Sequence, residues 1–236
     1  AGSVENVLLR NKLAKVNTGV NTLSYDQNNN GWMVGEGAGA VVLKRLDTAK
    51  QEQDRIYAVI DAISLVQARG TSDQVNPFPQ PPMAEAVIQA CQKAHTQAEI
   101  TPGDIGYLEV FGSGVPQEDE AEIRGLTQAY QTAKPDLSCG IGSVKANIGH
   151  TCTASGIASL IKTALCLYHR YIPATSQWTG PKMPEVWEGS PFYVATASRP
   201  WFLAPESPKR VAAINGMGME GTYAHIILSE EQSQSD

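Results

Sequence analysis

The sequence has no run of apolar residues long enough to cross a bilayer. A transmembrane helix needs about 20 predominantly apolar residues, and no run in this chain of 236 residues approaches that length. The first residues also lack the basic and then apolar segments of a secretory signal. We therefore expect a cytoplasmic protein without a membrane span.

Positive charge is also scarce. The chain has 18 Lys and Arg against 24 Asp and Glu, for a net charge of -6, and no stripe of basic residues. Because nucleic-acid binding depends on clustered cations, we expect no nucleic-acid partner. The composition, 42% hydrophobic and 18% charged, is typical of a globular protein with one large domain or two small ones.

The cysteines form neither a metal-binding pattern nor a disulfide framework. Cys91, Cys139, Cys152 and Cys166 are far apart in the sequence, with no CxxC pair and no accompanying cluster of histidines. This spacing predicts four reduced thiols and no metal site.

Both ends of the chain suggest a segment of something larger. It begins at Ala1 without an initiator Met, and "VENVLLRNKLAKV" has the helical spacing of domain interior sequence. We expect a processed piece or part of a longer polypeptide. The polar end, "SEEQSQSD", is typical of a linker or tail.

Apolar periodicity predicts alternating strands and helices, and hence a layered α/β fold. The segment 154–170 is apolar nearly all round, which predicts a core helix. The other expected helices are 81–97 and 118–131, and the expected strands are 38–46 and 55–68, paired with each other, followed by 105–110, 138–144, 191–197, 210–216 and 222–230.

Four motifs carry chemical information, although each has a plain structural alternative. The glycine-rich 25–45 favours close backbone packing over nucleotide binding, because a strand and not a helix is expected after it. In "YLEVFGSGVPQEDEAEI", a strand runs into a turn at Phe111, a side chain with no proton to exchange. Lys145 and His150 lie on a loop before an apolar helix, and could equally be surface residues. The segment 212–228 alone reads as a hairpin.

Together and in this order, the four motifs resemble the C-terminal half of a β-ketoacyl synthase, a thiolase-fold condensing enzyme. "EVFGSGVPQEDEAE" is similar to the family's "EAHGTGTPLGDPIE", and "GSVKANIGHTCTASGIASLIK" to its "GSVKSNIGHTEAAAGIAGLIK". "GEGAGAVVLKR" and "GMEGTYAHIIL" resemble two further signatures. The resemblance runs from about Leu23 to Leu228 and implies an α/β fold, the C-terminal half of a layered α-β-α-β-α thiolase-like architecture completed by an N-terminal half.

The resemblance also implies a division of the chain. Residues 1–30 would be the tail of the N-terminal half and a connecting loop, 31–230 the C-terminal ketosynthase-like half, and 231–236 a polar linker or tail. The family's nucleophilic cysteine would lie before Ala1, so this segment would not hold a complete site.

The family uses two histidines and a lysine around an acyl thioester. His150 matches the second histidine and Lys145 the lysine, whereas Phe111 stands where the first histidine belongs. A phenyl ring cannot donate a hydrogen bond to an enolate, so condensation should be impaired. The resemblance places five residues at the substrate: Phe111, Ser113, Val115, Met219 and Glu220; Cys152 replaces a family glutamate and Tyr223 a family asparagine.

These differences are most like a chain-length factor, a non-condensing partner of an active ketosynthase that shapes the acyl cavity, particularly that of polyunsaturated fatty acid synthases. The alternatives are an active β-ketoacyl synthase, favoured by the retained Lys145 and His150, and a docking domain without an acyl cavity. The implied partners are an active ketosynthase in a pseudo-symmetric dimer, the chain's own N-terminal half and an acyl carrier protein. No cofactor is expected to be bound, since the substrate is carried on the phosphopantetheine of the carrier protein.

Overall fold

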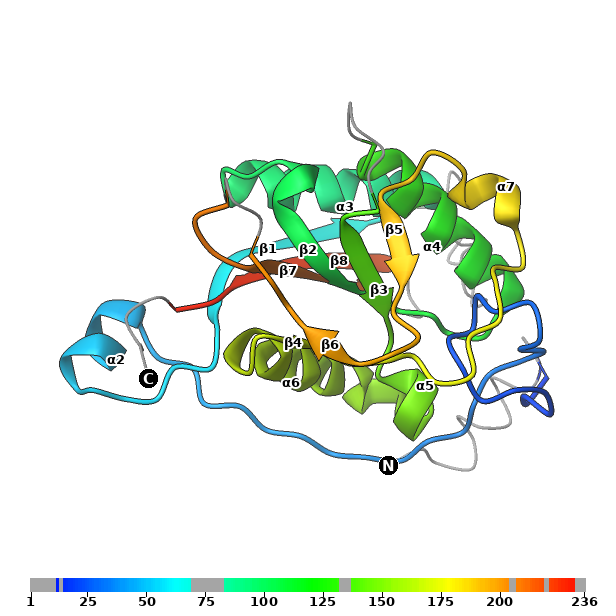
Figure 1. The fold of residues 1–236 in the computed structure, drawn as a ribbon, viewed down its shortest axis with the longest axis horizontal. Coiled ribbons are helices and arrows are strands. Elements are labelled where there is room, and N and C mark those ends of the chain that lie inside the picture. The colour runs from blue at the N-terminus through cyan, green and yellow to red at the C-terminus, as the bar shows by residue number, and fades with distance from the viewer. Residues whose placement is uncertain are drawn as a thin grey trace, which may run out of the picture.

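A six-stranded mixed sheet forms the centre of the structure, a computed structural model (Figure 1). The strand order is β1-β8-β7-β2-β3-β5, with antiparallel pairing from β1 to β7 and parallel pairing from β7 to β5. The strands are β1 (Val59–Gln67), β2 (Ile105–Glu109), β3 (Cys139–Gly142), β5 (Phe192–Val194), β7 (Val211–Met217) and β8 (Thr222–Ser229), with β4 (Tyr171–Ile172) and β6 (Arg199–Pro200) in a separate pair. The structure describes residue 12 and residues 15–68, 83–131, 137–203, 207–218 and 221–231.

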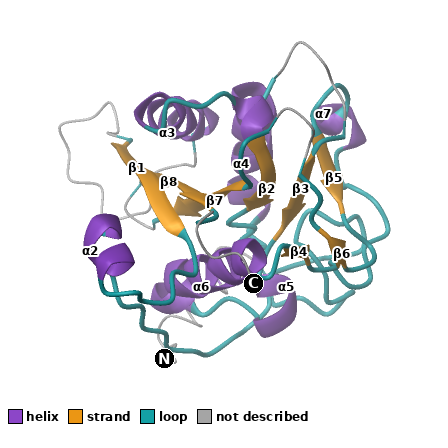
Figure 2. Ribbon diagram, turned by 60° about the vertical axis from the view of Figure 1, so that its left-hand side comes forward, coloured by secondary structure: helices purple, strands orange, loops and turns teal. Residues whose placement is uncertain are grey.

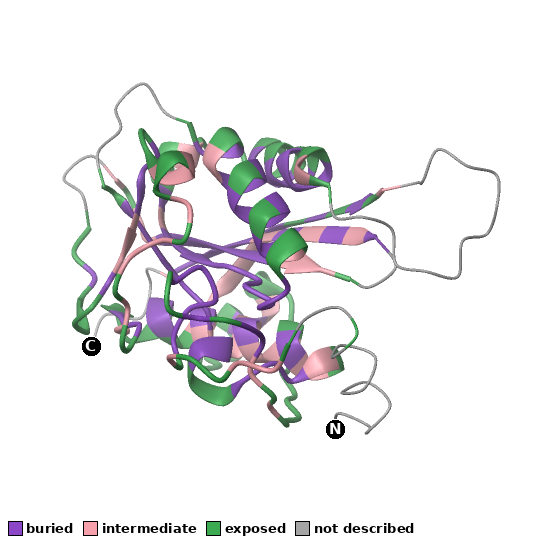
Figure 3. Ribbon diagram, turned by 90° about the vertical axis from the view of Figure 1, so that its right-hand side faces the viewer, coloured by how far each residue is buried: buried purple, intermediate pink, exposed green. Residues whose placement is uncertain are grey.

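Helices cover both faces of this sheet. Helices α3 (Ala84–Gln97) and α4 (Pro116–Ala129) pack on one face, and α6 (Ser155–Tyr168) lies on the other (Figures 1 and 2). Figure 3 shows the buried sheet between them, and the exposed outer sides of α3 and α4. The shorter helices are α2 (Leu46–Gln51), α5 (Lys145–Ile148) and α7 (Pro184–Trp187), with 3-10 turns at Pro102–Asp104 and Cys152–Ala154.

The predicted strand at 38–46 is wrong. Residues 35–45 run extended without a strand partner, and Leu46 already begins α2. β1 pairs instead with β8, from Val59 opposite Ser229 to Gln67 opposite Thr222. A strand needs a neighbour to satisfy its backbone groups, and the described part of the chain places none beside this segment, where Val42 is 96% exposed. The other predicted strands and the three long helices are confirmed within the described residues.

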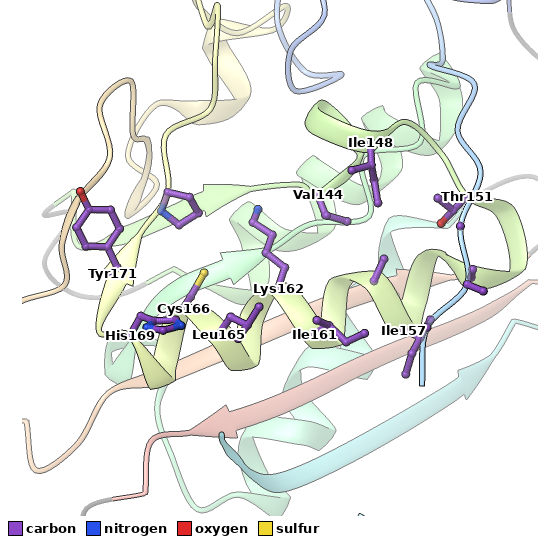
Figure 4. A pocket seen from close by; sticks show the side chains of 16 residues that line it. Val144, Ile148, Thr151, Ile157, Ile161, Lys162, Leu165, Cys166, His169 and Tyr171 are labelled. Atoms are coloured by element: carbon purple, nitrogen blue, oxygen red, sulfur yellow. The ribbon is translucent and has the colours of Figure 1, made fainter. Parts of the chain in front are cut away.

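Helix α6 has its polar side inward. Its most buried residues include Ser155, Ser159 and Thr163, which follow a four-residue spacing and face the sheet. Ile157 and Ile161 instead line a cavity on the outer side of the helix (Figure 4). The predicted helix is confirmed, and in the described part of the chain its buried residues lie on the side that faces the sheet.

The glycine-rich segment lies flat against this outer side. A Cβ atom on Gly39 would lie 3.0 Å from Cγ2 of Ile157, and a Cβ atom on Gly35 would lie 2.2 Å from the carbonyl oxygen of Ile148. Glycine at these positions permits the close backbone approach that we predicted from the motif.

Candidate functional site

The three residues singled out by sequence lie at the carboxyl ends of two parallel strands. Phe111 follows β2, Lys145 opens α5 after β3, and His150 comes just after α5. Open α/β sheets commonly bind ligands at this edge of the sheet.

The structure brings these three side chains into contact. The ring centroids of Phe111 and His150 are 5.4 Å apart, with the planes at 87°, an edge-to-face arrangement. The Lys145 Nζ lies 4.5 Å from the Phe111 ring centroid, within the range of a cation–π interaction. All three residues are buried.

His150 is held in one orientation and one tautomer. Its backbone N–H donates to the Met33 carbonyl at 2.8 Å, and its Nδ1 accepts a hydrogen bond from the backbone N–H of Cys152 at 3.0 Å. A neutral imidazole whose Nδ1 accepts carries its proton on Nε2. His150 is therefore set to donate from Nε2, as an oxyanion-binding histidine must.

A buried carboxylate fixes the turn after β2. Glu122, on α4, accepts hydrogen bonds from the backbone N–H groups of Phe111 at 2.7 Å and Gly112 at 2.8 Å. It also accepts from Asn215 Nδ2 at 2.6 Å and from the Tyr25 hydroxyl at 2.6 Å. Burial raises the pKa of Glu122, and these donors oppose the rise. Gly112 has a φ of +50°, which favours glycine at this turn.

The next part of the turn is held by Asp119. Its Oδ1 accepts from the Gly114 N–H at 3.2 Å and from the Ser113 hydroxyl at 3.4 Å. The Ser113 oxygen in turn accepts from the Val115 N–H at 3.0 Å. Burial, and then the nearby Glu122, raise the pKa of Asp119 to about 7. The Ser113 hydroxyl is thus used within the turn, and its contact with substrate remains a prediction, as does that of Val115.

Sequence reasoning missed Glu109, the last residue of β2. Its side chain is fully buried and lies 2.7 Å from the Nζ of Lys162, on α6. The one sequence signal was a carboxylate inside an otherwise apolar strand, since buried acids are rare unless they are paired.

The other residues named from the sequence are Met219, Glu220 and the four cysteines. Met219 and Glu220 lie outside the described residues. Cys152 is half-buried beside His150, while Cys91, Cys139 and Cys166 are buried, and all four thiols are free. In the described part of the chain, no group of His, Cys, Asp or Glu could hold a metal ion, and no helix is long and apolar enough to span a membrane.

A cavity of about 580 Å³ lies on the outer side of α6 (Figure 4). Its apolar wall includes Ile157, Ile161 and Leu165, and Val144 and Ile148 close one end. Neither Phe111 nor His150 lines it, so this cavity is separate from their contact.

Comparison with known families points to the same segments. The family described as "Beta-ketoacyl synthase, C-terminal domain" matches residues 57–179. The chain belongs to the β-ketoacyl synthase family. The N-terminal domain of the same family matches residues 6–49. The boundary that we predicted after residue 30 remains a prediction.

Solved ketosynthases have the same fold. The ketosynthase from module 6 of the bacillaene synthase of Bacillus subtilis 168 aligns with a TM-score of 0.84 and 34% identity, over 98% of this chain and 41% of that one. The oxazolomycin ketosynthase domain from Streptomyces albus aligns with a TM-score of 0.82 and 29% identity, over 99% of this chain and 41% of that one. The thiolase-like ketosynthase fold is therefore confirmed.

Curated relatives are polyketide synthases. Polyketide synthase PksL from Bacillus subtilis is 37% identical over 213 residues, which are 89% of this chain and 4% of that protein. A component of the phenolphthiocerol/phthiocerol polyketide synthase from Mycobacterium tuberculosis is also 37% identical, over 89% of this chain and 14% of that protein. The chain thus spans a small part of these relatives, and less than half of the solved ketosynthases.

Proposed function

We propose that this chain is the C-terminal part of a non-condensing ketosynthase domain, a chain-length factor that shapes an acyl cavity in polyketide-type or polyunsaturated lipid synthesis. The observation that carries the proposal is Phe111. The resemblance matches this residue to the family's first histidine, and its ring packs against His150 and Lys145.

Condensation develops a negative charge that the site must stabilise. Decarboxylation of a malonyl thioester produces an enolate, whose oxygen must receive hydrogen bonds from donors already in place. In the family two histidine side chains donate them, whereas here only His150 matches such a histidine, because the side chain of Phe111 has no N–H or O–H group. Loss of one preorganised donor costs on the order of 10²–10³ in rate.

Phe111 also changes the electrostatics around Lys145. The ammonium group lies over the face of the phenyl ring, and this contact contributes about 0.5–2 kcal/mol. The ring face thereby stabilises the positive charge of Lys145, while the rest of the ring remains an apolar surface. A wall of this kind suits an alkyl chain better than a developing anion.

The family resemblance and the outward apolar side of α6 indicate which partners to expect. A family nucleophile would come from an N-terminal half, acyl groups would arrive on the phosphopantetheine of an acyl carrier protein, and condensation would require an active ketosynthase partner. The outward apolar side of α6 and the exposed Val42 and Leu43 support an N-terminal half packed against this side.

The decisive test measures malonyl decarboxylation and condensation by the complete domain, purified away from any active ketosynthase. We expect no turnover above background for the natural domain. Where the N-terminal part supplies a cysteine, Phe111→His should raise decarboxylation on the order of 10²-fold; in this chain alone, the same change should not produce activity. Robust condensation by the natural domain would refute the proposal.

An active condensing ketosynthase is the second candidate. The tautomer of His150, set by the Cys152 N–H at 3.0 Å, and the retained Lys145 favour it. The effect of His150→Ala on turnover distinguishes the two candidate functions. An active enzyme would lose most of its rate, whereas a chain-length factor would leave the rate of its active partner close to that of the natural complex.

A further inference from the structure

Glu109 joins three elements: β2, the start of α5, and α6. Its carboxylate has no exposure to solvent, so its lone pairs must be satisfied by protein donors. The donors come from β2, from the residue before α5, and from α6: the Tyr107 hydroxyl at 2.9 Å, the Val144 backbone N–H at 2.6 Å, the Lys162 Nζ at 2.7 Å and the Ser159 hydroxyl at 3.4 Å.

The bond to Val144 matters because two site residues come soon after it in the chain. Helix α5 is only four residues long, begins with Lys145, and leads directly to His150. A single helical turn has little stability of its own, so its placement depends on contacts with the surrounding protein. Glu109 holds the start of this turn, and is itself two residues before Phe111.

Lys162 balances the charge of Glu109 from the other side. Its Nζ donates to the Glu109 carboxylate and also to the Tyr107 hydroxyl at 2.7 Å. Figure 4 shows Lys162 projecting from α6 toward the wall that carries Val144. Gly142, the last residue of β3, leaves the necessary space, since a Cβ atom there would lie 2.9 Å from the Tyr107 oxygen.

We propose that the Glu109–Lys162 ion pair is a positioning unit that sets Lys145 and His150 against Phe111. It contacts neither an acyl chain nor reacting atoms, and it acts through the start of α5. The inference rests on the proposed function only in treating the Phe111 contact group as the wall of an acyl site.

The test uses the complete domain with isotope-labelled lysine. The Lys145 ammonium lies over the Phe111 ring, so the neighbouring methylene should give a ring-current-shifted NMR signal, which Lys145→Arg would assign and Phe111→Leu would abolish. In the double variant Glu109→Leu/Lys162→Met, which removes both charges together, we expect this signal to move most of the way to its position in Phe111→Leu.

A matched control and a conservative variant make the test decisive. Glu120→Gln/Arg124→Met removes an exposed ion pair of 2.9 Å on α4 and should leave the Lys145 signal unchanged. Glu109→Gln keeps the shape but presents an N–H₂ group toward one of its donors, and should shift the signal partway. A wild-type signal in either Glu109 variant would overturn the proposal. If the double variant does not fold, Glu109→Gln decides alone.

Acyl binding provides a separate readout. The affinity for the octanoyl thioester of N-acetylcysteamine should fall on the order of tenfold in Glu109→Gln, because the binding wall is displaced. A shifted Lys145 signal with unchanged affinity would support the positioning unit and count against an acyl site at Phe111. The two proposals can therefore fail independently.

Discussion

The buried pair of histidines behind the site should make the stability of this protein fall in mild acid. His225 is fully buried, with Nε2 2.9 Å from the Tyr130 hydroxyl and Nδ1 3.3 Å from the Asn215 side-chain oxygen. Burial, and then the neighbouring His95, lower the pKa of His225 to about 3, and burial lowers the pKa of His95 to about 4.

The sign of the effect follows from proton linkage. Below pH 6.5 an unfolded histidine binds a proton that the folded His225 does not, so the free energy of unfolding decreases as the pH falls from 6.5 toward about 3. At about 1.4 kcal/mol per pH unit, each of the two groups removes about 2 kcal/mol between pH 7 and pH 5. Asp119, with its pKa raised to about 7, acts in the opposite direction, because it becomes protonated in the folded state first.

A comparison of variants isolates the histidine contribution. The free energies of unfolding of the wild type and of His225→Gln are measured in urea at pH 7 and pH 5, with His169→Gln, an exposed histidine after α6, as the control. The advantage of the wild type over His225→Gln should shrink by about 2 kcal/mol from pH 7 to pH 5. If the advantage is the same at both pH values, His225 is not held neutral and the reasoning is wrong.

Three other predictions concern the turn, its packing and the acyl cavity. Glu122→Ala removes the acceptor of two buried backbone N–H groups and should lower the free energy of unfolding, measured in urea, by about 3 kcal/mol or more. An unchanged free energy would contradict the role of Glu122 in holding the turn after β2. Gly114→Ala should cost about 2 kcal/mol or more, since its φ is +80° and the new Cβ would lie 2.4 Å from Cα of Trp32. The matched change Gly156→Ala, at a position of α6 with no neighbouring atom within 4 Å of the new Cβ, should instead raise the free energy of unfolding, by at most about 1 kcal/mol. Met219→Trp should shorten the products of the complex, analysed by mass spectrometry, and products of unchanged length would exclude Met219 from the cavity.

The family resemblance, and not local pattern alone, grouped Phe111, Lys145 and His150 in one site. Phe111 and Lys145 each follow a short buried strand, and the two strands are parallel neighbours, so their carboxyl ends meet. The family resemblance then supplied the expected roles of these positions, which spacing alone left open.

Other features depend on partners that no local pattern reveals. The Val-rich segment 38–46 has strand propensity, but pairing also needs a neighbouring strand. Glu109 meets a lysine 53 residues later in the chain, and nothing near either residue indicates the other. The inward face of α6 was missed because periodicity finds apolar residues, while this helix meets the sheet with small hydroxyl residues.

The two faces of α6, polar toward the sheet and apolar toward the cavity, should be subject to different evolutionary constraints. Toward the sheet, Ser155, Ser159 and Thr163 require small side chains, so enlargement should be harmful even when it adds apolar surface. Toward the cavity, Ile157 and Ile161 contribute little to the core of this chain, and a charged substitution there should spare its own fold. Variation on the inner face would therefore record constraints of folding, and variation on the outer face constraints of assembly.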